Sequence, residues 1–158
     1  MTGDDPETTL RTRLVGGLIR RVGLVTRAVT FGVRGIVVDP QDRIFLVRHT
    51  YVPGWYLPGG GVEGDEDAAA SLARELVEEG NIALSAEPDL FGLYAHAPRS
   101  HVAVYVARAF TQSAPKAPDW EIAEAGFFPL YSLPDNSTRA TRARIAEFRG
   151  LAPKSRRW

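Results

Sequence analysis

Three glutamates and an arginine stand close together in the stretch "SLARELVEEGN", residues 71–81. If this stretch is helical, Glu75, Glu78 and Glu79 occupy relative positions 0, 3 and 4 and lie on one side of the helix, where like charges repel. The chain has 19 basic and 19 acidic residues and a formal net charge of zero, so a need for solubility does not explain the cluster. Converging carboxylate oxygens are the ligands that magnesium, manganese and calcium prefer. The spacing therefore predicts a cation site.

Three consecutive glycines, Gly59, Gly60 and Gly61, precede the glutamates in the chain. Glycine allows close backbone approach and positive φ, so carbonyl or amide groups of this loop can point at an ion or a phosphate. A solvated acidic helix face is the alternative interpretation, but such a face normally pairs glutamates with lysines four residues away. Here the favourable partner within the helix is Arg74, four residues before Glu78. We therefore favour an oxygen cage for a divalent ion.

A helix over about Ala68–Glu79 is needed to hold these carboxylates. Asp67 can serve as its N-cap, and Gly80-Asn81 is a stop signal of the kind that ends helices in a left-handed turn. At about 100° per residue, the three glutamates lie opposite one continuous apolar half. That apolar half consists of Ala69, Leu72, Ala73, Leu76, Val77 and Gly80. One face of the helix is expected in the core, and the other is expected to carry the acidic patch.

The rest of the chain from residue 30 onward alternates between strand patterns and turns. β-Branched and alternating runs predict strands over 31–39, 43–49, 89–97, 101–110 and 121–130. The other expected elements are a hairpin-like turn at 39–42, a proline-rich loop at 111–119 and a closing helix at 137–150. Strands interrupted by two well-separated helices predict an α/β fold in which the helices pack on a sheet.

The N-terminal segment has its own pattern. Leucines and valines recur at three- and four-residue steps over residues 10–29, with arginines between them, which predicts an amphipathic helix. One interpretation is a helix on a membrane surface. We favour an element that packs on the domain or on a second subunit, which would make the protein a homodimer. The expected organisation is an N-terminal amphipathic segment (1–28), one enzyme-sized domain (29–150) and a basic tail (151–158).

Composition excludes several classes of protein. The length of 158 residues suits one domain, and 44% hydrophobic and 24% charged residues are typical of a globular protein. Balanced charge gives no bulk attraction to nucleic acid, and the absence of cysteine excludes disulfides, thiolate catalysis and cysteine-bound zinc. The first ten residues are acidic and polar, unlike a secretory signal, and no apolar run reaches the roughly 18 residues needed to span a bilayer. We expect no membrane partner and a cytoplasmic location.

The spacing of the acidic stretch resembles a known motif. Gly60, Glu66 and the run from Arg74 to Ile82 fit the Nudix box, G-x5-E-x7-R-E-U-x-E-E-x-G-U with U aliphatic, except that Asn81 replaces the second glycine. "GWYLPGGGVE" and "WEIAEAGFFPLYSLP" are also similar to segments of that family, so the resemblance covers roughly residues 30–150. It implies a Nudix-like α/β/α sandwich with a mixed central sheet. Asparagine tolerates the left-handed conformation, and Gly80 could also take over the turn.

The resemblance also implies a chemistry. Nudix hydrolases use Mg²⁺ or Mn²⁺ to hydrolyse the pyrophosphate bond of a nucleoside diphosphate derivative, such as a nucleoside triphosphate, ADP-ribose or a nucleotide sugar. The resemblance assigns the metal to the Gly59 carbonyl and to Glu75, Glu78 and Glu79. Glu78, rather than Glu75, is the residue we expect to take the proton of the attacking water. Arg74 is expected to pair with Glu66 and to orient the helix.

Residues outside the box are candidates for contact with a nucleotide. Five residues before the glycine loop could contact phosphate or stack on a base: Arg48, His49, Tyr51, Trp55 and Tyr56. For Trp55 and Tyr56 core packing is the favoured role, and none of the three scattered histidines is expected to be a ligand. Glu121, after the proline-rich loop, could add a carboxylate to the site. A different class of function is also open, a catalytically silent Nudix-like domain that binds a nucleotide as a sensor. Retention of every acidic residue of the box favours the enzyme.

Overall fold

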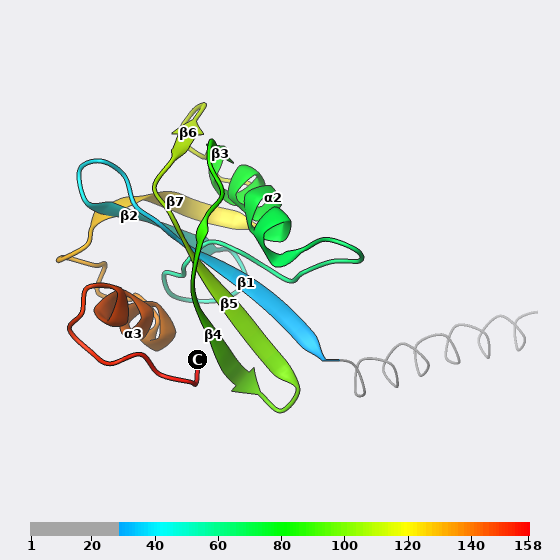
Figure 1. Cartoon of the computed structure of the whole chain (residues 1–158). Helices are drawn as coiled ribbons and strands as arrows, with labels where there is room; N and C mark the ends of the chain where they lie inside the picture. The colour runs from blue at the N-terminus through cyan, green and yellow to red at the C-terminus, as the bar shows by residue number, and fades with distance from the viewer. Residues whose placement is uncertain (1–28) are drawn as a thin grey trace, which may run out of the picture. The chain divides into compact units, whose positions relative to one another are not determined.

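The computed structural model describes residues 29–158 (Figure 1). The amphipathic helix predicted from residue 10 onward, and with it the N-terminal segment 1–28, lies outside the described residues. The described elements are β1 (Thr30–Val37), β2 (Arg43–His49), α2 (Ala68–Gly80), β3 (Ile82–Leu84), β4 (Asp89–Ala97), β5 (Ser100–Ala107), β6 (Phe110–Gln112), β7 (Ile122–Pro129) and α3 (Arg139–Phe148).

The strands pair in three groups, β1-β5-β4, β2-β7 and β3-β6. β4 and β5 are antiparallel, as are β2 and β7. β1 lies beside β5 and runs in the same direction (Figure 1), so strands of both orientations are present. The fold is therefore the predicted α/β arrangement with mixed strands.

Two hydrophobic cores lie on opposite faces of the strands. Along β2, Ile44 and Leu46 belong to one core, whereas Phe45 and Val47 belong to the other. This alternation follows from the two-residue period of a strand. The first core includes Ile145 of α3 and the second includes Leu72 and Leu76 of α2. One helix therefore covers each face, which is the expected α/β/α sandwich.

The predicted hairpin-like turn at 39–42 is present, although the two strands that it joins pair only next to the turn. The Asp39 carboxylate accepts hydrogen bonds from the backbone N–H groups of Gln41 (3.0 Å) and Arg43 (2.9 Å), which closes the turn. Past one bridge between Val38 and Ile44 the strands separate, because β1 pairs with β5 and β2 with β7. The turn thus connects two sheets.

The strand predicted over 101–110 is divided, and the short pair β3-β6 was not predicted. β5 ends at Ala107, and the chain then pairs again from Phe110 to Gln112 with Ile82–Leu84. Thr111 and Gln112 therefore belong to a strand and not to the proline-rich loop. Three-residue strands carry too few alternations for a sequence pattern to reveal them.

Both ends of α2 follow from local residue chemistry. Asp67 is the N-cap, and its side chain accepts a hydrogen bond from Ala70 N at 2.8 Å. Asn81 is the C-cap and adopts the left-handed conformation itself, with φ 54° and ψ 32°. Gly80 does not take over the turn. It is required for another reason, because a Cβ at Gly80 would lie 2.8 Å from the Phe45 ring.

We expect Gly80→Ala to lower the free energy of unfolding by about 1–3 kcal/mol, the usual cost of overpacking a core. The added methyl group must displace the Phe45 ring, which is fully buried. Urea denaturation of both proteins measures the change. Gly126→Ala is the matched control, because a Cβ at Gly126 meets nothing within 4 Å. Equal stability of Gly80→Ala and the wild type would contradict the assigned packing.

The segment after α3 packs back on the domain, although the sequence suggested a separate basic tail. Ser155 N donates to the Glu147 carboxylate at 3.0 Å, and Trp158 N donates to the Ala95 carbonyl at 3.0 Å. The Trp158 ring lies 6.0 Å from that of Tyr94, edge to face. Residues 151–158 therefore form part of the same compact unit as the strands.

Candidate active site

The glycine loop is fixed between β1 and α2. Gly35 N donates to the Pro58 carbonyl and Val33 N to the Gly60 carbonyl, both at 2.9 Å. Gly59 has φ 133°, and a Cβ there would collide with the Val33 carbonyl oxygen. A Cβ on Gly60 would lie 2.6 Å from the Glu75 carboxylate carbon. The loop therefore needs glycine at both positions in order to lie against β1 and the acidic helix.

The helical wheel predicted that Glu79 lies on the exposed acidic face, but in the structure it is buried. Its exposed fraction is 3%, whereas Val77, assigned to the apolar half, is 51% exposed. The Glu79 carboxylate instead accepts a hydrogen bond from Gly59 N at 2.7 Å. Burial raises the pKa of Glu79 to about 8, although the Gly59 hydrogen bond and the Arg34 charge oppose the shift. The buried face of the helix is thus turned toward the glycine loop.

Arg74 connects the other carboxylates of the box. Its guanidinium contacts Glu66 at 3.0 Å, Glu75 at 2.9 Å and Glu78 at 3.3 Å. The pairing with Glu66 matches the expected orienting contact, and it lowers the pKa of Glu66. Burial raises the pKa of Glu75, partly offset by Arg74. Glu78 is 58% exposed and remains the most accessible carboxylate of the three glutamates.

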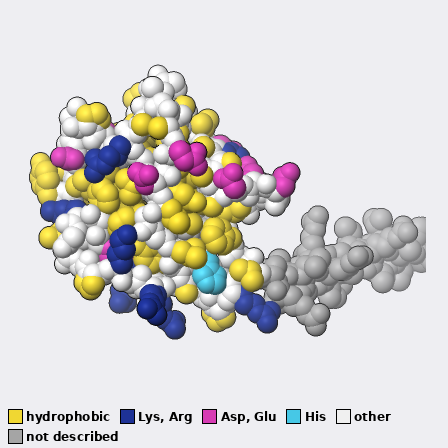
Figure 2. All heavy atoms as spheres, in the orientation of Figure 1, with side chains coloured by type: hydrophobic (Ala, Val, Ile, Leu, Met, Phe, Trp, Pro, Cys, Tyr) yellow, Lys and Arg dark blue, Asp and Glu magenta, His cyan; other side chains and the backbone are white. Residues whose placement is uncertain are grey.

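The space-filling view shows separate acidic side chains distributed over this face of the molecule, with hydrophobic surface between them (Figure 2). Arg34 of β1 stands close to the carboxylates of Glu75 and Glu79. Its guanidinium donates a short hydrogen bond to the Gly59 carbonyl and a longer one, 3.4 Å, to the Leu57 carbonyl. The carbonyl expected to bind metal therefore already faces a cation. No sequence pattern predicted this role for Arg34, which lies 25 residues from Gly59 in the chain.

His49 and Glu121 complete the inner wall of the site. His49 Nε2 lies 3.7 Å from Glu79 Oε1, and ligand atoms of His49, Glu79 and Glu121 all lie within 4.8 Å of one another. Burial and the Arg34 charge lower the pKa of His49, which favours the neutral imidazole. The predicted approach of Glu121 to the carboxylates of α2 is therefore present. A ligand role was not expected for His49, although the residue continues the Phe45 and Val47 face of β2, which α2 covers.

A hollow of about 350 Å³ adjoins this wall. Its lining is Arg48, His49, Thr50, Tyr51, Val52, Pro53, Gly54 and Asn136. Arg48 pairs with Glu124 at 3.0 Å on the surface, and Tyr51 is 66% exposed beside the His49 ring. The position of Asn136 in this lining was not predicted, because nothing in its local sequence links it to residues 48–54.

Trp55 packs in the core, the role that the sequence favoured over a contact with substrate. Its exposed fraction is 6%, and its ring packs edge-on against Phe128 with centroids 4.7 Å apart. Arg48 covers the ring from 5.9 Å. Trp55 thus belongs to the core next to α3, and no face of its ring is free to stack on a base.

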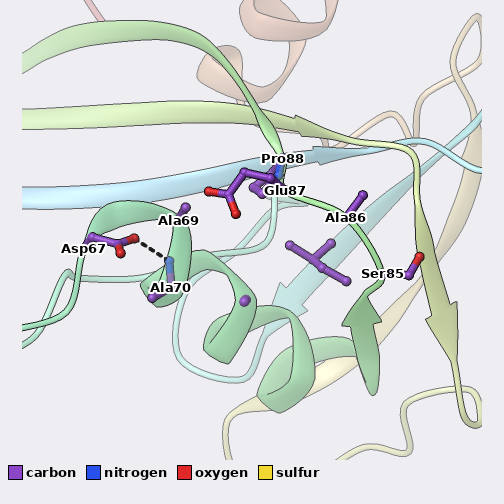
Figure 3. A pocket seen from close by; sticks show the side chains of 9 residues that line it. Asp67, Ala69, Ala70, Ser85, Ala86, Glu87 and Pro88 are labelled. Carbon is purple, nitrogen blue, oxygen red and sulfur yellow. Dashed lines mark hydrogen bonds between the residues drawn. The ribbon is translucent and has the colours of Figure 1, made fainter.

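A second hollow, of about 380 Å³, lies between the start of α2 and the β3–β4 connection (Figure 3). Alanines form much of its wall, and the Asp67 carboxylate in it caps the helix through Ala70 N. Glu87 is the other ionisable side chain of the lining. This hollow lacks converging polar groups, so the acidic site at Gly59 is the better candidate.

The residues of the acidic site fit a divalent cation. Carboxylates of Glu75 and Glu79 approach a loop in which Gly59 and Gly60 leave no room for a larger residue. Their oxygen atoms are the donor type that Mg²⁺ and Mn²⁺ prefer. The contact of the Arg34 guanidinium with Gly59 also shows that the position attracts positive charge.

The α/β/α fold and the acidic site on α2 are those of a Nudix domain, and comparisons with known proteins agree with that class. The family model "NUDIX domain" matches residues 28–148. The chain belongs to the Nudix hydrolase family. No helix of residues 29–158 is both long and apolar enough to cross a membrane.

Three relatives illustrate the similarity. The chain is 36% identical over 72 residues to a MutT-like protein of Streptomyces ambofaciens, covering 46% of each chain. It is 40% identical over 53 residues to an RNA pyrophosphohydrolase of Dinoroseobacter shibae, covering 32% of this chain and 33% of that protein. The matches therefore span less than half the length of these curated relatives. The crystal structure of a MutT NUDIX hydrolase from Burkholderia pseudomallei superposes with a TM-score of 0.64 and 30% identity, covering 73% of this chain and 95% of that one.

Proposed function

We propose that the protein hydrolyses the pyrophosphate bond of a nucleoside diphosphate derivative and that it requires Mg²⁺ or Mn²⁺. The observation that carries the proposal is the approach of the Glu75 and Glu79 carboxylates to the Gly59–Gly60 loop. Membership of the Nudix hydrolase family supports the same reaction class.

The proposed roles follow from exposure and contacts. The Gly59 carbonyl and the carboxylates of Glu75, Glu78 and Glu79 hold the cation, which when bound neutralises phosphate charge and positions a water. Arg34 must release the Gly59 carbonyl for this. Glu78 is open to solvent, which lets its carboxylate accept the proton of the attacking water.

Arg74 acts by positioning and not by touching substrate. Its contacts with Glu66, Glu75 and Glu78 hold three carboxylates in place around one guanidinium. Loss of this group would leave the carboxylates to repel one another. The site therefore depends on Arg74 even though the guanidinium is directed at protein groups.

The hollow beside His49 is the proposed nucleotide site. Arg48 offers a guanidinium for phosphate, and the exposed Tyr51 ring offers a surface on which a base can stack. The Arg48 guanidinium pairs with the Glu124 carboxylate at 3.0 Å, so a phosphate would have to compete with that carboxylate. The name of the Dinoroseobacter shibae relative, an RNA pyrophosphohydrolase, gives RNA priority among the substrates to test.

The test is a substrate panel of nucleoside and deoxynucleoside triphosphates, a 5′-triphosphate oligoribonucleotide, ADP-ribose and UDP-sugars, each with and without Mg²⁺ or Mn²⁺. We expect release of a nucleoside monophosphate or of phosphate products with at least one substrate. Chelation by EDTA should abolish the release, and added Mg²⁺ or Mn²⁺ should restore it. Product chromatography gives the measurement.

A result with measurable nucleotide binding and no turnover of any substrate would overturn the proposal. It would favour a nucleotide-binding sensor that keeps the fold. Turnover that persists in EDTA would contradict the cation requirement and leave the assigned reaction standing.

A further inference from the structure

His49 is a buried imidazole with an unused polar atom. Its exposed fraction is 8%, and its Nδ1 has no hydrogen-bond partner among the described residues. Its Nε2 lies 3.7 Å from Glu79 Oε1, which is longer than a hydrogen bond. Neither ring nitrogen therefore has a hydrogen bond among the described residues, and Nε2, the nitrogen that faces Glu79, is free to bind a ligand.

Glu121 brings a second carboxylate to the same point. The β2–β7 pairing places His49 opposite Ile122, next to Glu121. Hydrogen bonds from Thr50 N to the Glu121 carbonyl and from Glu121 N to the Asp119 carboxylate, both 2.9 Å, fix this segment. The ligand atoms of His49, Glu79 and Glu121 then all lie within 4.8 Å of one another, although they come from three separate segments.

The distance between His49 Nε2 and Glu79 Oε1 suits two ligands of one ion better than it suits a direct hydrogen bond. With bonds of about 2.1 Å, neighbouring ligands of a bound metal lie about 3.0–3.4 Å apart. The 3.7 Å between Nε2 and Oε1 is close to that value. Small side-chain shifts would close the group on an ion.

The surrounding charge also permits a cation. Glu75, Glu79 and Glu121 supply three carboxylates near this point, and Arg34 supplies one compensating positive charge. His49 also forms part of the wall of the hollow of about 350 Å³.

We propose that His49, Glu79 and Glu121 form a mixed nitrogen–oxygen site for a divalent transition metal such as Mn²⁺, Co²⁺ or Zn²⁺. It extends the cation site of the proposed function, since Glu79 belongs to both. Imidazole is a better ligand for transition metals than for Mg²⁺. The site therefore makes the chain favour Mn²⁺ or Co²⁺ over Mg²⁺ more strongly than carboxylates alone would.

The test uses the full chain loaded with Mn²⁺ and no substrate. Pulsed electron paramagnetic resonance is expected to show ¹⁴N coupling from an imidazole bound to Mn²⁺. The coupling should disappear in His49→Gln, and the Mn²⁺ dissociation constant should rise by about tenfold or more. His96→Gln is the matched control because His96 is exposed, and it should keep both the coupling and the affinity.

Bound Mn²⁺ without ¹⁴N coupling, or coupling that persists in His49→Gln, would overturn the site. If His49→Gln does not fold, His96→Gln and His101→Gln replace it, because the chain has three histidines and coupling that persists in both variants comes from His49. Coupling that is lost in either of them would overturn the site. The assay is independent of turnover. Substrate turnover without ¹⁴N coupling would rule out this site and leave the proposed function. Coupling without turnover of any substrate would support this site and overturn the proposed function.

Discussion

Replacing Glu78 by glutamine is expected to lower kcat by about 10²–10⁴-fold, the usual contribution of a general base. The amide keeps the size of the side chain but cannot accept a proton from water. Stability should change by less than about 0.5 kcal/mol, because Glu78 is 58% exposed and its contact with Arg74 is a surface ion pair. Steady-state kinetics on the best substrate of the panel and urea denaturation give the two numbers.

Two other variants make this result specific. Glu87→Gln removes an exposed carboxylate away from the glycine loop and should leave kcat unchanged. Glu75→Gln tests the competing assignment of the base. If Glu75→Gln loses the larger share of kcat and Glu78→Gln is near normal, with both proteins folded, the proton acceptor is Glu75. The pH–rate profile separates loss of a base from loss of a cation ligand, because removing the base removes the acidic limb of the profile.

The parts of the site that the sequence could predict depend on neighbours within a few residues. Asp67 caps α2, and Asn81 ends it in the left-handed conformation, because these are local backbone preferences. The contact of Arg74 with Glu66 spans eight residues and follows from the box spacing. The sequence therefore predicted the extent of the acidic helix and the contact of Arg74 with Glu66.

Burial of Glu79 could not be predicted from the helical wheel. The wheel separates polar from apolar positions, and it has no information on a partner outside the helix. That partner is the N–H of Gly59, 20 residues earlier, at 2.7 Å. The same limit explains Val77, which is exposed because the helix is rotated toward the loop.

The His49 group depends on strand register, which is a non-local property. The two-residue period of β2 places His49 on the face of Phe45 and Val47, so its side was predictable in principle. Its closeness to Glu121 requires the β2–β7 pairing, which joins segments more than 70 residues apart in the chain. The strands on either side of the turn at 39–42 illustrate the same limit, since no local signal shows that β1 and β2 pair with other strands beyond the turn.

Replacing Arg144 by leucine is expected to lower the free energy of unfolding by about 3–5 kcal/mol, the usual cost of removing one member of a buried ion pair. Arg144 is 2% exposed and donates to Glu147 at 2.6 Å and to the Arg157 carbonyl at 3.1 Å. Its guanidinium also lies 4.1 Å from the centroid of the Tyr94 ring. Without Arg144, the buried Glu147 carboxylate loses its counter-charge, and the 151–158 segment loses its anchor at residue 157. Urea denaturation at pH 7 measures the loss.

The exposed arginine of the same helix gives the control. Arg139→Leu removes a guanidinium at the solvent-exposed start of α3 and should change stability by less than about 0.5 kcal/mol. A loss of similar size in both variants would mean that apolar substitution on α3, and not the buried pair, is responsible. The double variant Arg144→Leu/Glu147→Gln should recover part of the loss, because it leaves no uncompensated charge.

The pH dependence of the loss follows from Glu147. Burial alone would raise the pKa of Glu147, but hydrogen bonds from Ser155, Tyr94 and Arg144 outweigh it, so the pKa lies below its ordinary value of 4.5. In the wild type the stabilising contribution of this carboxylate is present above pH 4.5 and is lost as pH falls through the lower, folded-state pKa. In Arg144→Leu the positive charge that compensates the Glu147 carboxylate is gone, so protonation of Glu147 removes the uncompensated buried charge. The stability difference between wild type and variant should therefore narrow as pH falls from 7 toward 4, and a difference that is constant over this range would show that the charge of Glu147 is not what Arg144 compensates.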